Sequence, residues 1–136
     1  MKLTLFTDGG ARGNPGPAAA GIVIKNENNK ILSAYGEYLG EQTNNYAEYS
    51  ALISGLKKAK ELGATEVDCI LDSELVAKQM KLEYKVREAT LQKLFVQAYN
   101  AATAFKKTTY RHVLRHNNKE ADRLVNEILD KKTPSK

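Results

Sequence analysis

The chain of 136 residues contains 21 Lys or Arg against 16 Asp or Glu, and its net charge is +5. This length suits one domain with one hydrophobic core, so residues 1–130 are expected to form that domain and residues 131–136 a flexible tail. No apolar run approaches the ~20 residues of a membrane span, and Asp8 comes too early in the chain for a signal peptide. The single cysteine, Cys69, excludes an internal disulfide, so a reduced, cytoplasmic location is the expectation.

The excess of basic residues favours a polyanionic partner such as nucleic acid. Charge alone does not identify that partner, because many small basic proteins bind nothing specific. If several carboxylates formed an active site in this basic protein, cations would be needed there before a phosphate could enter.

Three strands are predicted in the first part of the chain. Residues 2–8 alternate well enough for a strand, and a glycine-rich loop follows at 9–17. Residues 18–25 and 31–39 are predicted as the second and third strands, and the polar segment 26–30 between them as a hairpin turn.

The apolar periodicity then becomes helical over residues 45–62, with Thr43 or Asn44 as N-cap and Gly63 as the stop. The remaining predicted elements are a strand at 65–71, helices at 73–82 and 90–105, a strand at 108–114 and a helix at 118–129. This order predicts an α/β fold with a mixed five-stranded sheet of order 3-2-1-4-5, flanked by helices.

Two aspartates mark the point where the strand order of this sheet reverses. Asp8 ends the first predicted strand and Asp72 ends the fourth, and the connections diverge between these two strands. Open α/β sheets bind ligands at such a switch point, at the carboxyl ends of the strands. The sequence therefore predicts a functional site between these two strand ends.

Two further carboxylates are placed to join them. Glu48 lies four residues before Leu52, so both occupy the helix face that is turned toward the sheet. Asp122 lies in the last predicted helix, next to the inward-facing Ala121. Carboxylates that converge repel one another, and divalent cations relieve that repulsion: Mg²⁺ suits such oxygen ligands, and two ions about 3.5–4 Å apart promote phosphodiester hydrolysis.

Each of these residues also has a structural interpretation. An aspartate at a strand end is often only a turn former or a helix cap, although this explanation is weaker for all four carboxylates together. His112 is in phase with its strand and fits a structural role, whereas His116 precedes the last helix, where a proton-transfer role is conceivable. The glycine-rich loop lacks the Gly-Lys-Ser/Thr ending of a P-loop; it is either a wide turn or a place where a nucleic-acid backbone approaches closely.

Taken together, five short motifs resemble those of the type 1 ribonuclease H family. They occur in the family's order and span nearly the whole chain. The motifs are Thr7-Asp8-Gly9-Gly10 with Gly13-Asn14-Pro15-Gly16-Pro17, Thr43-Asn44-Asn45-Tyr46-Ala47-Glu48, Asp72-Ser73-Glu74-Leu75-Val76, Glu83-Tyr84-Lys85-Val86 and Asn118-Lys119-Glu120-Ala121-Asp122-Arg123-Leu124.

The resemblance implies a metal-dependent endonuclease that hydrolyses the RNA strand of an RNA–DNA hybrid and leaves 3′-hydroxyl and 5′-phosphate ends. It implies that two Mg²⁺ ions, with Mn²⁺ as the expected substitute, are held by four carboxylates. These are Asp8, Glu48, Asp72 and Asp122.

The resemblance also implies a substrate-binding surface. Residues at four positions match those that read the minor groove of the hybrid, namely Asn14, Asn44, Asn45 and Glu74. Amide groups both donate and accept hydrogen bonds, which suits base edges and 2′-hydroxyls. Thr43 matches a position that contacts the DNA backbone.

Two departures from the family pattern concern substrate binding and catalysis. Many members insert a basic, Trp-rich helix and loop, but here residues 85–90 lead directly into the next helix and the chain has no Trp. The chain therefore resembles compact members, for which weaker hybrid binding or a compensating partner domain is expected. The loop before Asp122 is short, so both His116 and Arg115 are candidates for the position of the family's catalytic histidine.

Two other functions remain open at this stage. A related domain could hold the hybrid without cutting it, although the complete carboxylate set argues against this. A nuclease or strand-transfer enzyme of the same broad fold could act on DNA, but that class usually carries further domains. The expected partner is thus an RNA–DNA hybrid, bound by a monomer that does not associate with a membrane.

Overall fold

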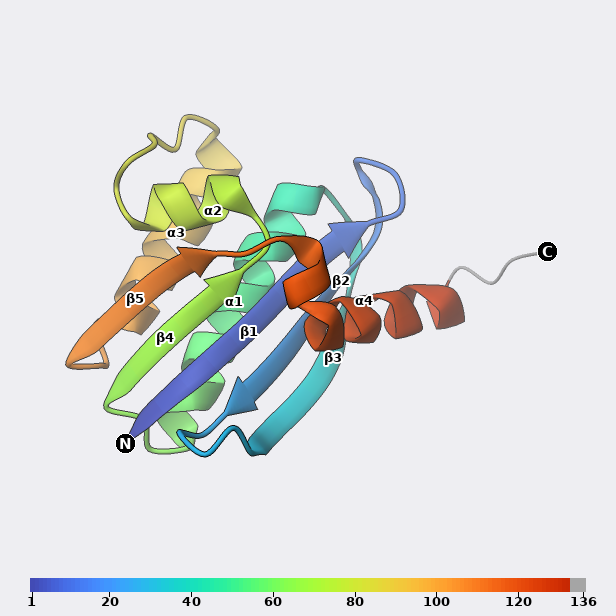
Figure 1. Ribbon diagram of the computed structural model, residues 1–136. Helices are drawn as coiled ribbons and strands as arrows, with labels where there is room; N and C mark the ends of the chain where they lie inside the picture. The colour runs from blue at the N-terminus through green and yellow to red at the C-terminus, as the bar shows by residue number, and fades with distance from the viewer. Residues whose placement is uncertain (133–136) are drawn as a thin grey trace.

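The computed structural model describes residues 1–132. Five strands form one sheet in the predicted order β3-β2-β1-β4-β5, and helices pack on both of its faces (Figure 1). The elements in chain order are β1 (Lys2–Ala11), β2 (Gly16–Lys25), β3 (Ile31–Gln42), α1 (Asn44–Glu61), β4 (Glu66–Leu71), α2 (Glu74–Met80), α3 (Ala89–Ala102), β5 (Lys107–His112), a 3₁₀ turn (Arg115–Asn117) and α4 (Lys119–Lys132). The predicted fold class and strand order are confirmed.

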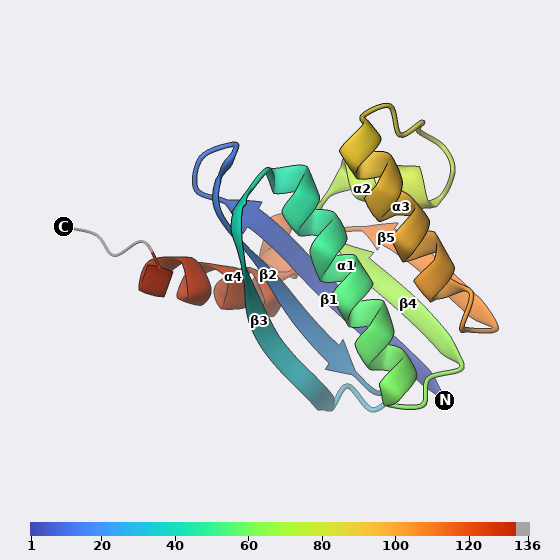
Figure 2. The ribbon, with the colours of Figure 1, turned by 180° about the vertical axis from the view of Figure 1, so that it is seen from behind.

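The helices form two unequal layers, one on each face of the sheet. α1, α2 and α3 cover one face of the sheet and share the main hydrophobic core with β1, β2 and β4, whereas α4 crosses the opposite face (Figure 2). α4 rests on a small separate cluster, in which Val125 and Leu129 pack on Ala19 with Ile128 beside them. One face of the sheet is therefore anchored deeply, and the other is anchored by few apolar side chains.

β1 runs three residues past Asp8, so the prediction that this strand ends at Asp8 was wrong. Antiparallel pairing with β2 continues to the pair Ala11↔Ala18, and the expected loop shrinks accordingly. A Cβ at Gly9 would lie 2.3 Å from the backbone carbon of Ala47. Glycine is therefore needed here because the strand passes directly against the start of α1, and this close approach fixes the helix over the strand end.

The start and end of α1 confirm the sequence signals. Thr43 is the N-cap, and its hydroxyl accepts a hydrogen bond from the backbone N–H of Tyr46. Gly63 follows the helix with a φ of +89°, a conformation that favours glycine. Glu48 lies on the buried face of α1, as its spacing from Leu52 predicts.

The remaining differences lie at segment ends. Residues 81–88, between α2 and α3, contain neither helix nor strand, consistent with a compact chain that lacks the basic insertion. α4 includes residues 131–132 of the expected tail, and residues 133–136 lie outside the described residues. Within the described part of the chain, every helix is too short or too polar to cross a membrane.

Candidate active site

Three of the four predicted carboxylates converge at the switch point of the sheet. Asp8, Glu48 and Asp72 each place one carboxylate oxygen within 4.8 Å of the other two. The parallel pairing of β1 with β4 ends at Thr7↔Leu71, so the next residue of each strand is one of these aspartates. Glu48 enters from α1, which Gly9 allows to approach closely.

Asp122 reaches the same place from the opposite face of the sheet. Its carboxylate is near enough to Asp8 to raise the pKa of that residue, but it is not part of the group of three. Asp122 Oδ2 accepts a hydrogen bond of 3.4 Å from Asn126 Nδ2, one turn along α4. Asp8, Glu48 and Asp122 line one cavity of about 390 Å³.

The electrostatics of the cluster favour a bound cation. Burial raises the pKa of Asp8 to about 8, and the nearby charges of Asp72 and Asp122 add to the shift. Burial is also the largest cause of the raised pKa values of Glu48 and Asp72. Glu48 Oε2 and Asp72 Oδ1 are buried without a hydrogen-bond partner among the described residues. This set of hard, buried, unpaired oxygen atoms fits Mg²⁺, because a divalent ion would supply both the missing charge and the missing partner.

Two of the predicted substrate-binding amides, Asn14 and Asn44, accept hydrogen bonds from backbone N–H groups. The backbone N–H of Asn44 donates to Asn14 Oδ1 at 3.0 Å, and the backbone N–H of Ala11 donates to Asn44 Oδ1 at 2.8 Å. These bonds tie the β1–β2 turn to the start of α1. Asn44 and Asn45 line the carboxylate cavity, so the tie also sets the edge of the predicted binding surface.

Glu74 is placed beside the cluster at the start of α2, where Ser73 caps the helix. One carboxylate oxygen of Glu74 lies 3.4 Å from Lys78 Nζ, and the other lies 4.0 Å from His112 Nδ1. His112 is therefore a neighbour of a predicted substrate-binding residue. His112 is exposed at the end of β5, and the structural role expected from its phase stays a prediction.

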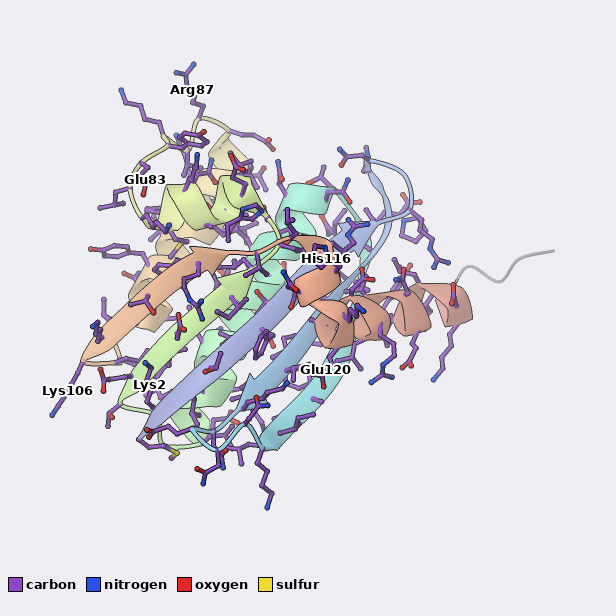
Figure 3. The ribbon with its side chains drawn as sticks, in the orientation of Figure 1. Lys2, Glu83, Arg87, Lys106, His116 and Glu120 are labelled. Carbon is purple, nitrogen blue, oxygen red and sulfur yellow. The ribbon has the colours of Figure 1, made fainter. Side chains whose placement is uncertain are left out.

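The first two side chains of the 3₁₀ turn before α4, Arg115 and His116, line different cavities. Arg115 lines the carboxylate cavity, and its Nε lies 3.9 Å from Asp72 Oδ2 although its side chain is 77% exposed. His116 instead lines a second cavity with Phe6 and Lys25, on the face of the sheet that carries α4 (Figure 3). The cavity assignments thus favour Arg115 as the cationic side chain beside the cluster.

Two residues at the site were not among the predicted site residues, although Asn118 begins one of the five motifs. Arg12 lines the carboxylate cavity and pairs with Asp130 at 2.6 Å. Asn118 is 2% exposed, and its side chain bonds to the carbonyl of Thr7. Neither could have been found by periodicity, because each acts through a contact more than a hundred residues away in the chain.

Comparisons with known proteins agree with this geometry. Residues 6–128 match the family model described as reverse transcriptase-like. The crystal structure of RNase H1 from Halobacterium salinarum superposes with a TM-score of 0.94 at 37% identity, over 96% of this chain and 99% of that one. A structure of LC11-RNase H1 in complex with an RNA/DNA hybrid gives a TM-score of 0.91 at 41% identity, over 96% and 98% of the two chains.

A bifunctional protein of Mycobacterium tuberculosis is 44% identical over 131 residues, which is 96% of this chain. The chain spans only 36% of the length of that relative, so the match concerns one part of a larger protein. The fold, the ordered motifs and the near-complete overlap with RNase H1 structures lead to one assignment: the chain belongs to the type 1 ribonuclease H family.

Proposed function

We propose that this chain is an endonuclease that hydrolyses the RNA strand of RNA–DNA hybrids, with Asp8, Glu48, Asp72 and Asp122 as the metal-binding carboxylates. The observation that carries the proposal is the convergence of three carboxylates within 4.8 Å of one another, with Asp8 and Glu48 buried and Asp72 partly buried. Two of them leave an oxygen atom without a partner among the described residues. Such a cluster is costly to fold unless cations compensate it, which a metal-dependent nuclease explains.

The four carboxylates would hold two Mg²⁺ ions, with Mn²⁺ as a substitute. When bound, such a pair supplies an activated water and stabilises the leaving oxygen of the phosphodiester. The chain itself fixes the geometry: β1 and β4 present Asp8 and Asp72 side by side, α1 adds Glu48 from the core, and α4 adds Asp122 from the other face.

The substrate surface follows from the residues around the cavity. The Oδ1 atoms of Asn14 and Asn44 are occupied by backbone donors, so these two side chains would offer their NH₂ groups to the minor groove. Asn45, which lines the cavity, and Glu74, at the start of α2, would add to this surface. Thr43 stands at the N-terminus of α1, whose first turn contains no acid, and this end of a helix favours a backbone phosphate.

Arg115 is proposed as the positively charged side chain that binds a substrate phosphate beside the carboxylates. It approaches Asp72 without burial, so its long side chain is available to a phosphate, to which a guanidinium can donate two parallel hydrogen bonds. His116 remains the alternative for proton transfer, but it would have to turn from the cavity that it lines with Phe6 and Lys25.

The chain is further proposed to act as a monomer in the cytoplasm. All four carboxylates come from one chain, so catalysis needs no second copy. The cysteine is buried and unpaired, which is consistent with a reducing compartment.

Cleavage of labelled substrates tests the proposal. RNA–DNA hybrid, duplex DNA, duplex RNA and single strands are incubated with the protein in Mg²⁺ and, as a control, in EDTA. The expected result is Mg²⁺-dependent cutting of the RNA strand of the hybrid alone, with 5′-phosphate ends. Binding of the hybrid without cleavage would favour a binding module, and cutting of duplex DNA would favour a DNA-directed nuclease.

A further inference from the structure

The fourth carboxylate depends on a different part of the fold from the other three. β1, α1 and β4 share the main hydrophobic core, and they carry Asp8, Glu48 and Asp72. Asp122 is carried by α4, whose buried apolar cluster is small and whose backbone at Ala121 lies directly against Gly21 of β2. The position of Asp122 relative to the other three carboxylates is therefore set by the contacts of α4 with the sheet and not by the main core.

One buried side chain connects the start of α4 to the strand that carries Asp8. Asn118 Nδ2 donates to the backbone carbonyl of Thr7 at 2.8 Å, and Thr7 directly precedes Asp8. The backbone carbonyl of Asn118 accepts from the N–H of Asp122 at 3.1 Å. Two hydrogen bonds in series thus lead from the backbone beside Asp8 to the backbone of Asp122.

The Thr7 carbonyl lies at a specific position in the sheet. Thr7 is the last residue of β1 that pairs with β4, because the two strands separate after Thr7↔Leu71. Asn118 therefore binds β1 at the point of strand separation, next to the metal-binding residues. The other polar tether of this end of α4, the ion pair of 2.8 Å between Lys25 and Glu120, is attached to β2 instead.

The other polar atom of the Asn118 side chain, Oδ1, indicates which of its two groups holds the fold together. Asn118 Oδ1 is buried and has no hydrogen-bond partner among the described residues. A buried polar atom without a partner is unfavourable, so the NH₂ group that binds Thr7 is the part with a clear role. An aspartate here would place a carboxylate against the Thr7 carbonyl and add a negative charge beside the cluster.

We propose that Asn118 is a positioning residue, which fixes Asp122 relative to Asp8 and thereby sets how tightly the protein holds divalent cations. This inference rests on the proposed function, because it assumes that Asp122 is a metal ligand. Residues that orient metal ligands typically change metal affinity by about 10–100-fold when they are mutated. An effect near tenfold is expected here, because Asn118 acts through the backbone of α4 and not on the carboxylate itself.

The test measures cation binding without substrate. Mg²⁺ and Mn²⁺ are each titrated into wild-type protein, Asn118→Ala and Lys25→Met by calorimetry, and thermal unfolding of the three metal-free proteins is recorded. Lys25→Met is the matched control, since it removes the other tether of the same helix end. The expected result is a dissociation constant about tenfold weaker for Asn118→Ala and unchanged for Lys25→Met, with cleavage by Asn118→Ala largely restored at saturating cation.

Equal cation affinity in Asn118→Ala and wild type would overturn the inference, and so would an equal loss in Lys25→Met, which would show only general loosening of α4. If Asn118→Ala does not fold, Asn118→Ser decides in the same titration, because its hydroxyl is too short to reach Thr7 yet leaves a polar side chain. A wild-type protein that neither binds cations nor cleaves hybrid would instead reject the proposed function itself.

Discussion

Removing one charge from the carboxylate cluster should stabilise the metal-free protein. Asp8 is 4% exposed, and its pKa rises from 3.8 to about 8, first through burial and then through the charge of Asp72. The folded state therefore binds the proton more tightly than the unfolded state. The stability due to this group is fully present below about pH 4 and is lost progressively as the pH rises to about 8.

The size of this effect follows from the shift. One pKa unit corresponds to about 1.4 kcal/mol, so the full shift of Asp8 corresponds to ~6 kcal/mol at most. Asp8→Asn removes the charge but keeps a buried polar group, which retains part of the burial penalty. We therefore expect the free energy of unfolding of Asp8→Asn to exceed that of wild type by about 2 kcal/mol near pH 8 without metal. This difference raises Tm by roughly 5–10 °C.

Thermal unfolding in EDTA, recorded from about pH 5 to about pH 9, measures the effect. The difference between Asp8→Asn and wild type should grow with pH and should reverse when Mg²⁺ is added, because only the wild type then gains the full set of ligands. Asp68→Asn is the control: its pKa is lowered although burial opposes this, because Arg111 and Thr109 bind the carboxylate. Its loss should destabilise the protein regardless of Mg²⁺. An Asp8→Asn protein no more stable than wild type at pH 8 in EDTA would refute the reasoning.

Three further predictions concern activity. Asp8→Asn and Asp72→Asn should each abolish cleavage in Mg²⁺ while hybrid binding is largely kept, and near-normal turnover by either variant would contradict the metal assignment. Arg115→Ala should lower the single-turnover rate by about a hundredfold and His116→Ala by about tenfold or less; the reverse order would return the catalytic role to His116. Hybrid binding should weaken as the salt concentration rises. The slope of log binding constant against log salt concentration should be shallower than that of a relative carrying the basic insertion, since each phosphate contact adds roughly −0.9 to it on B-form DNA. An equal slope would show that other residues replace the insertion.

The sheet could be predicted because its information is local. Alternation in the strands and three- to four-residue spacing in the helices identify the elements, and the caps at Thr43 and Gly63 mark the ends of α1. The end of β1 could not be predicted in the same way. Glycine normally indicates a loop, and Gly9 belongs to the strand only because β2 continues to pair with β1 and Ala47 lies against it. Both contacts are tertiary.

The residues of the candidate site also differ in whether local sequence patterns could place them. Asp8, Asp72 and Glu48 could be placed together because strand order and helix phase determine their positions. The position of Asp122 depends on how α4 lies across the sheet, which no periodicity specifies. The choice between Arg115 and His116 depends on a single 3₁₀ turn, in which adjacent side chains enter different cavities. Proximity in sequence to Asp122 therefore identified the segment, and the choice between its two side chains stays a prediction.

The orientation of two amides in the predicted substrate surface is set by their hydrogen bonds to the backbone. Asn14 and Asn44 each have an acceptor oxygen held by a backbone N–H, which fixes the orientation of the amide and turns its NH₂ group toward other partners. The two amides thus offer hydrogen-bond donors, whereas the carboxylate of Glu74 offers acceptors. A 2′-hydroxyl both donates and accepts hydrogen bonds, so it suits both kinds of group. A deoxyribose lacks that hydroxyl, so under the proposed function these two kinds of group would favour the RNA strand.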